Sequence, residues 1–228
     1  MSTTLKIGFL LYPGLTPLDA IGPAQALGAL PNAEIHMIWK DTQPVVTDVG
    51  FLITPTVSMA ECPDLDVICV PGGGGQALIM DDQQVLSFLK YQGEQAKYVT
   101  SVCSGSLLLG AAGLLNGYRA TSHWAVLEYL SLFGAEPVAD RVVRDRNRFT
   151  GGGVTAGIDF GLTLVAEIAG EDLAKVIQLS LEYDPKPPFK AGSPETAGPE
   201  IEANVRARFA KLMAQEGSGF PEPDSVKL

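Results

Sequence analysis

The sequence predicts a three-layer α/β fold in which helices cover both faces of a mostly parallel sheet. Two observations carry this prediction. Segments such as LKIGFLLYP (residues 5–13) and LDVICVPGGGG (65–75) are apolar at nearly every position, which is typical of strands buried on both faces. These segments alternate with amphipathic, helical stretches, as the crossover connections of a parallel sheet require.

The first half of the chain supplies strands and helices in turn. Besides the strands at 5–13 and 65–75, we expect a loop and helix at 18–30, a second strand at 33–40, and an amphipathic helix at 82–96. The stretch FLITPTVSM (51–59) reads as a short β excursion. Pro55 confines it to an edge of the sheet, because proline cannot donate to a ladder of strands.

The second half continues the alternation. We expect a strand that ends at Cys103, the helix SLLLGAAGLL (106–115) stopped by Asn116-Gly117, a helix at 119–134, a hairpin at 141–153 that turns at residues 145–147, and helices at 155–170 and 171–183. No internal repeat interrupts this order.

One α/β domain is expected to span residues 1–197. Its end includes a proline-rich segment, DPKPPFKAGSPETAGPE (184–200), which we expect to wrap the surface and contribute to an interface. Residues 198–228 are expected to form a C-terminal helix and a flexible tail, not a separate domain.

Composition narrows the class of partner. The chain has 228 residues and a formal net charge of −10, which argues against a nucleic acid or an anionic membrane as its partner. The apolar run in MSTTLKIGFLLYPG is short and lacks a cleavage site of small residues, so it is expected to be the first strand and not a signal peptide. The odd count of three cysteines suits a reducing cytoplasm.

Several chemistry-bearing features fall where parallel strands end. Gly72–Gly75, Cys103 and Gly151–Gly153 each follow a predicted strand, and Asp19 follows the first strand. In open α/β sheets, ligands bind at the carboxyl ends of the strands. The functional site is therefore expected where these residues meet.

The glycine loops are weak evidence for a nucleotide. Both match a loose dinucleotide fingerprint, but neither follows the first strand and neither ends in Gly-Lys-Ser/Thr. A loop that presents backbone N–H groups to a ligand is the better interpretation. For Gly74 and Gly75, a plain strand-to-helix turn remains an equal alternative.

Cys103 is the candidate nucleophile. A free cysteine is usually a small buried hydrophobic residue, and Cys69 inside its strand fits that description. Cys103 instead stands at a strand-to-helix corner with Ser104, Gly105 and Ser106 behind it. A helix N-terminus stabilises a thiolate, so we expect a reactive thiol of lowered pKa.

A thiol needs a partner that moves protons. His123 stands at a predicted helix start, capped by Ser122 or Thr121, and is more often a packing residue there than a base. Asp19 is either a helix cap or a carboxyl group beside the thiol. In the second case, burial behind Leu18 and Ile21 would raise its pKa and let it carry a proton near neutrality.

Five ordered motifs resemble the PfpI-type superfamily, which has the class I glutamine amidotransferase-like fold. They are FLLYPGLTPLDAIGP, DVICVPGGGG, VTSVCSGSLLLGAAGLLNGYRATSHW, TGGGVTAGIDFGL and QLSLEYDPKPPFKAGSPETA. The resemblance covers the chain to about Ala197 and implies a flavodoxin-like three-layer sandwich with a strand-to-helix nucleophile elbow. Within the superfamily the motifs are most similar to the isocyanide hydratases, followed by the effector domains of arabinose-regulator-type transcription factors.

The resemblance also implies roles for individual residues. Cys103 would be the nucleophile and Asp19 its acidic partner, where many relatives have glutamate. Ser104 stands where the hydratases usually have threonine. Gly72 and Gly73 would donate N–H groups to developing charge, and Val154 would form a site wall, where the hydratases tend to have isoleucine.

Two departures from the superfamily's patterns argue against other activities. The peptidases place histidine directly after the cysteine, where this chain has Ser104. The regulators append a helix-turn-helix DNA-binding domain, and nothing after Tyr183 is long or basic enough to form one.

The implied reaction is hydration of an isocyanide to an N-substituted formamide through a covalent cysteine thioimidate, without cofactor or metal. A homodimer is expected by analogy. A glyoxal-type hydratase, a thiol-based oxidative-stress sensor and a non-catalytic ligand-binding domain remain alternatives.

Overall fold

A computed structural model describes residues 4–215 and contains a central sheet of seven strands. The strand order is β10-β11-β7-β6-β1-β2-β5, and every neighbouring pair is parallel except β10 and β11. The strands are β1 (Leu5–Leu10), β2 (Ala33–Trp39), β5 (Val57–Ser58), β6 (Val67–Val70), β7 (Tyr98–Val102), β10 (Val142–Asp145) and β11 (Arg148–Gly151). The predicted mostly parallel sheet is confirmed.

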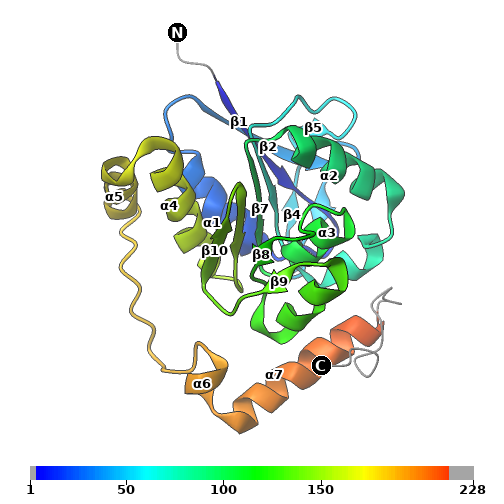
Figure 1. Cartoon of the computed structure of the whole chain (residues 1–228), viewed down its shortest axis with the longest axis vertical. Helices are drawn as coiled ribbons and strands as arrows, with labels where there is room; N and C mark the ends of the chain where they lie inside the picture. The colour runs from blue at the N-terminus through cyan, green and yellow to red at the C-terminus, as the bar shows by residue number, and fades with distance from the viewer. Residues whose placement is uncertain (1–3, 216–228) are drawn as a thin grey trace.

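Helices cover both faces of this sheet (Figure 1). On one side lie α1 (Pro17–Leu27), α4 (Ala156–Ala169) and α5 (Glu171–Ser180). On the other lie α2 (Gln83–Gln95), α3 (Gly105–Ala111) and a 3₁₀ helix, η2 (Trp124–Phe133). The three-layer arrangement is therefore the expected flavodoxin-like sandwich.

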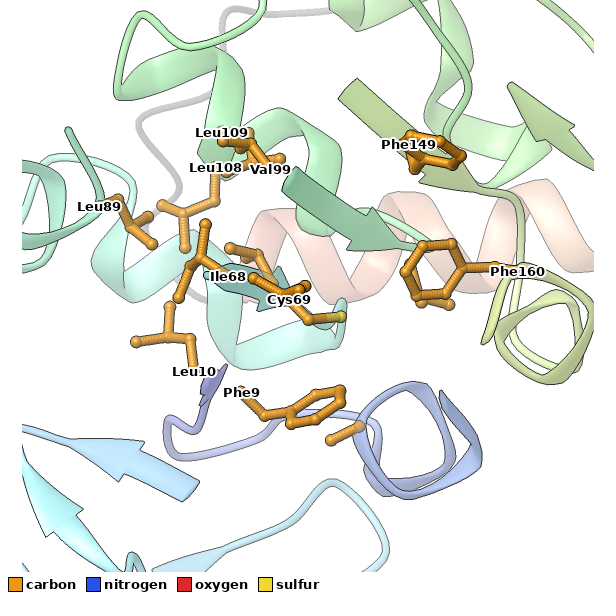
Figure 2. Packing of buried hydrophobic residues seen from close by; sticks show 14 of the residues in the cluster. Phe9, Leu10, Ile68, Cys69, Leu89, Val99, Leu108, Leu109, Phe149 and Phe160 are labelled. Atoms are coloured by element: carbon orange, nitrogen blue, oxygen red, sulfur yellow. The ribbon is translucent and has the colours of Figure 1, made fainter. Parts of the chain in front are cut away.

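The core has two apolar layers, because alternate strand residues point to opposite faces. Figure 2 shows Phe9 and Cys69 on the side of Phe160 of α4, whereas their neighbours Leu10 and Ile68 point the other way. All of these residues are fully buried. Cys69 is thus a core residue, as predicted.

Two small sheets lie outside the central one. β3 (Val45–Val46) and β4 (Leu52–Ile53) pair antiparallel, and β8 (Arg119–Ala120) and β9 (Glu136–Pro137) pair parallel. β5, two residues after Pro55, is the last strand at one edge of the central sheet. The predicted edge position of this excursion is confirmed.

Two predicted helices differ from the structure. α3 ends at Ala111 and not before Asn116-Gly117, because the Leu114 N–H bonds to the Leu109 carbonyl and Gly113 takes a φ of +77° in a Schellman motif. In the stretch 119–134, pairing of β8 with β9 removes the first residues from the helix. The remainder is η2, a 3₁₀ helix.

The C-terminal part runs from α5 to two further helices. Residues 184–192 are exposed and form neither helix nor strand, and they run outside the sheet layers (Figure 1). α6 (Pro194–Ala197) and α7 (Pro199–Gln215) follow, so the expected last helix is present. The flexible tail was predicted for residues 216–228, which lie outside the residues that the structure describes. Within residues 4–215, no helix has the length and apolar character needed to cross a membrane.

Candidate active site

Cys103 lies at the turn between β7 and α3, as the sequence predicted. Its φ of +58° belongs to the left-handed region, which non-glycine residues seldom adopt outside strained, functional turns. The Cys103 N–H donates to the carbonyls of Gly151 and Gly152 at the end of β11, 3.0 Å to each. The neighbouring strand therefore fixes the corner, and Cys103 as a residue is 5% exposed.

Gly105 lets α3 approach the sheet at this corner. A Cβ on Gly105 would lie 2.0 Å from the carbonyl oxygen of Val70 in β6. Only glycine permits such a close approach between two backbones. The Ser-Gly sequence after the cysteine is thus part of the geometry that holds Cys103 at the end of β7.

Asp19 lies beside the thiol and is not a helix cap. Thr16 occupies the N-cap of α1, whereas Asp19 is the third residue of that helix and is fully buried. One Asp19 carboxyl oxygen, Oδ2, accepts the Gly72 N–H at 2.9 Å. The other, Oδ1, is buried without a hydrogen-bond partner among the described residues. This arrangement favours the second of the two interpretations offered by the sequence.

Burial dominates the protonation of both groups. It raises the pKa of Asp19 to about 7, against the opposing effects of the Gly72 N–H and the Cys103 thiol. Burial and the negative charge of Asp19 raise the pKa of the Cys103 thiol well above its usual value, although the Ser104 N–H and hydroxyl oppose the shift. The expected lowering of the thiol pKa by the helix N-terminus is therefore wrong, because desolvation outweighs it. Leu18 and Ile21 are 39% and 42% exposed, so they are not the shield that was expected.

The other predicted site residues surround this pair. Gly73 donates its N–H to the Ser104 hydroxyl at 3.3 Å, as Gly72 does to Asp19. These donors hold the side chains of Asp19 and Ser104 in the present geometry. Their action on developing charge, and that of Ser104 on a substrate, stays a prediction.

His123 is a neutral cap in this structure. Its Nδ1 accepts the N–H of Ala125, so His123 itself caps η2, and not Ser122 or Thr121. Burial lowers the pKa of His123 to about 4, which leaves the imidazole uncharged at neutral pH. With Nδ1 occupied as an acceptor, the ring proton belongs on Nε2, and neither nitrogen is free to act as a base.

Two features of the site were missed from the sequence. The Ser122 hydroxyl donates to the Cys103 carbonyl at 3.1 Å, where the sequence had suggested only a helix cap. Val154, the predicted wall residue, lines a cavity of about 490 Å³ together with the start of η2 and residues 192–195. No motif in the sequence places that C-terminal segment near the site.

The described residues provide no group of three or more histidine, cysteine, aspartate or glutamate side chains placed to hold a metal ion. Their chemistry is that of a thiol and a carboxyl group sharing protons in a dry environment. Such a pair suits covalent catalysis by addition and elimination, in which the carboxyl group alternates between base and acid.

Comparisons with known proteins show the family to which the chain belongs. The model of the DJ-1/PfpI family matches residues 5–167. The isonitrile hydratase of Pseudomonas putida is 55% identical over 206 residues, covering 90% of this chain and 90% of that protein. The HTH-type transcriptional regulator GbdR of Pseudomonas aeruginosa is 32% identical over 187 residues, which are 78% of this chain and 51% of the regulator.

Solved structures extend the likeness to the fold. A ThiJ/PfpI family protein from Pseudomonas syringae superposes with a TM-score of 0.91 at 47% identity, covering 96% of this chain and 92% of that one. Drosophila melanogaster DJ-1beta superposes with a TM-score of 0.71 at 22% identity over 79% of this chain and 98% of its own, which supports the fold alone.

Proposed function

Because the chain belongs to the DJ-1/PfpI family, we propose that it is an isocyanide hydratase, which converts an isocyanide and water into an N-substituted formamide. Isonitrile is another name for isocyanide, so the 55% identity to the Pseudomonas putida isonitrile hydratase over 90% of both chains supports the substrate class. The single observation in the structure that carries the proposal is the buried pair of Cys103 and Asp19.

The first step forms the thioimidate. The terminal carbon of R–N≡C accepts both a nucleophile and a proton. Cys103 sulfur attacks this carbon while Asp19 takes the thiol proton and delivers it to the same carbon, giving R–N=CH–S–Cys103. A carboxyl group with a pKa of about 7 is well matched to this transfer near neutral pH.

The second step consumes water. The ionised Asp19 takes a proton from water, whose oxygen adds to the thioimidate carbon, and passes that proton to the nitrogen. The tetrahedral R–NH–CH(OH)–S–Cys103 then loses its hydroxyl proton to Asp19 and expels the Cys103 thiolate. The products are R–NH–CHO and a Cys103–Asp19 pair that holds one proton, as it did at the start. Atoms and protons therefore balance. The N–H and hydroxyl of Ser104 interact with the Cys103 thiol, and Gly73 donates its N–H to that hydroxyl. Both residues are the candidate donors to developing charge.

The direct test is the steady-state appearance of N-cyclohexylformamide from cyclohexyl isocyanide. Wild type should turn over, and Cys103→Ala should abolish turnover. Cys62→Ala is the matched control, because Cys62 is a half-buried thiol outside the site and burial raises its pKa to about 11. No turnover by wild type, or turnover that survives in Cys103→Ala, would contradict the proposal.

The alternatives differ in their demands on the thiol. An oxidative-stress sensor needs an accessible thiolate, whereas Cys103 is 5% exposed and burial raises its pKa. Intact-mass analysis after mild peroxide tests this alternative, and rapid addition of two oxygens at Cys103 would favour it. A glyoxal-type hydratase would consume α-oxoaldehydes in preference to isocyanides, and a non-catalytic domain would bind ligand without product.

The assembly and location of the enzyme also remain proposals. We place it in a reducing cytoplasm, since Cys62, Cys69 and Cys103 are all free thiols. A homodimer is proposed by analogy, and light scattering after gel filtration distinguishes it from a monomer of 24.1 kDa.

A further inference from the structure

A cavity of about 490 Å³ adjoins the backbone of the nucleophile. Its volume lies in the range of pockets that hold small organic ligands. The lining comes from the start of η2, the turn before β10, the end of β11 and the segment before α6, and includes Ser122, His123, Trp124, Gly152, Val154 and Glu195.

Two lining residues touch Cys103 directly. Ser122 donates its hydroxyl to the Cys103 carbonyl at 3.1 Å, and the Gly152 carbonyl accepts the Cys103 N–H at 3.0 Å. Cys103 is not itself a lining residue, but two residues of the cavity wall are hydrogen-bonded to its backbone. An isocyanide is linear at nitrogen, so its substituent projects directly away from the carbon that sulfur attacks and needs space of this kind beside the nucleophile.

The walls of the cavity are partly apolar, and its charged residues are acidic or already paired. Trp124, Leu127 and Val154 contribute apolar surface. Asp140 and Glu195 are exposed acidic residues of the lining. The guanidinium of Arg141 is held by Asp159, 2.6 Å from its Oδ2. Such a lining favours neutral apolar groups and disfavours carboxylates.

The C-terminal segment completes this cavity from outside the residues matched to the family. Gly192, Ser193, Pro194 and Glu195 are part of the lining, whereas the family match ends at residue 167. α7 then lies against the start of η2: the Phe209 ring stacks on His123 with 4.5 Å between centroids, and the Arg206 guanidinium lies 4.7 Å from the Trp124 ring centroid. Figure 1 shows α6 and α7 running below the body of the domain toward η2.

We propose that this cavity receives the nitrogen substituent of the isocyanide, and that the C-terminal segment selects bulky, uncharged, apolar substituents. The inference rests on the proposed hydratase function. Phe209 is a positioning residue in this proposal, because it does not touch the reacting atoms. Its ring holds the His123 ring and thereby the start of η2. Truncating Phe209 should weaken binding of large substituents and leave small ones and the chemical step unchanged.

The test separates binding from turnover. The chain has two tryptophans, Trp39 and Trp124, so in a Trp39→Phe background the fluorescence reports on Trp124 alone. Titration with the inert product N-cyclohexylformamide should give a saturable change in that fluorescence. Phe209→Ala should raise its Kd about tenfold, because loss of the ring stacked on His123 loosens that wall of the cavity. Ile201→Ala, a truncation of an apolar residue on the same helix that is 50% exposed, should change the Kd less than about twofold.

Steady-state kinetics supply the second readout. For cyclohexyl isocyanide, Phe209→Ala should raise KM about tenfold with kcat within about twofold, whereas kcat/KM for methyl isocyanide should stay within about twofold of wild type. Absence of a saturable fluorescence change in wild type, or equal losses on both substrates, would overturn the inference. Saturable binding without any turnover would overturn the hydratase proposal and leave the binding cavity standing.

Discussion

At the residue scale, the protonation of Asp19 should control the rate. With a pKa of about 7, the carboxyl group is protonated below neutrality, and the thiol beside it is protonated as well. The doubly protonated pair has no base to take the thiol proton, so kcat/KM should fall about tenfold per pH unit below 7. Above 7 the pair carries one proton and the rate should level off.

A pH profile of kcat/KM between pH 5.5 and 9 with a neutral alkyl isocyanide tests this assignment. Asp19→Glu should keep a break in the profile at an altered pH, because a carboxyl group remains, whereas the residual rate of Asp19→Asn should lose it. A wild-type profile that is flat across this range would show that Asp19 is not the controlling group.

The same carboxyl group should destabilise the fold at alkaline pH. The folded-state pKa of about 7 exceeds the ordinary value of 3.8, so the folded state binds this proton more tightly than the unfolded chain does. This contribution to stability is complete below pH 4 and is lost as the pH rises through 7. A shift of about three pKa units corresponds to about 4 kcal/mol at most.

Asp19→Asn should therefore raise the free energy of unfolding at pH 8 by up to about 4 kcal/mol and change it little at pH 4. Urea unfolding at both values measures the difference. Asp66→Asn is the control, because the pKa of Asp66 is shifted in the opposite direction. Burial raises this pKa, but hydrogen bonds from Lys97 and the Lys6 N–H outweigh burial and hold the pKa below its usual value. Equal stability of wild type and Asp19→Asn at pH 8 would contradict the buried-charge account.

At the scale of elements, the junction of β7 with α3 should be far less tolerant than the other end of that helix. In Gly105→Ala the new Cβ would meet the Val70 carbonyl at 2.0 Å, and two backbones would have to separate. We expect a loss of about 3 kcal/mol in stability and about a hundredfold in kcat/KM, since the shift moves Cys103 itself.

Gly113→Ala is the matched substitution at the C-terminal end of α3. Gly113 has a φ of +77° but open space around its missing Cβ, so alanine should cost only about 1 kcal/mol and leave kcat/KM within about twofold. Thermal unfolding and turnover of both variants give the comparison. Similar activities for the two variants would mean that the corner does not position the thiol.

The elements also differ in how far the sequence predicts them. Strands such as β6 follow from local composition, because an apolar run beside amphipathic helices has few other stable arrangements. The end of α3 does not follow from local composition. Two stop signals, Gly113 and Asn116-Gly117, compete, and a hydrogen bond from the Leu114 N–H decides between them. Likewise, η2 depends on the pairing of β8 with β9, which no local pattern encodes.

At the scale of the whole molecule, the site is only partly predictable from the sequence, because some of its features depend on contacts that no local pattern encodes. Cys103 and Asp19 follow apolar strands, and the rule that parallel strands share an edge brings them together. Their pKa values depend on burial by the complete fold, so the helix N-terminus alone gave the wrong direction for the thiol. The contact of Phe209 with His123 joins distant parts of the chain that share no recognisable motif.

The net charge of −10 is a property of the whole molecule that should influence which isocyanides react. Asp140 and Glu195 line the cavity whose wall is hydrogen-bonded to the Cys103 backbone. A molecule of this charge repels anions over roughly a Debye length, about 10 Å at 0.1 M salt. Isocyanoacetate and its methyl ester share the reacting group and differ in charge. We expect kcat/KM to be at least about tenfold lower for the anion at 50 mM salt. The ratio should shrink severalfold at 500 mM, because salt screens the repulsion. The ester should respond little to salt, and a ratio that is independent of ionic strength would mean that the acidic residues do not contribute to selection.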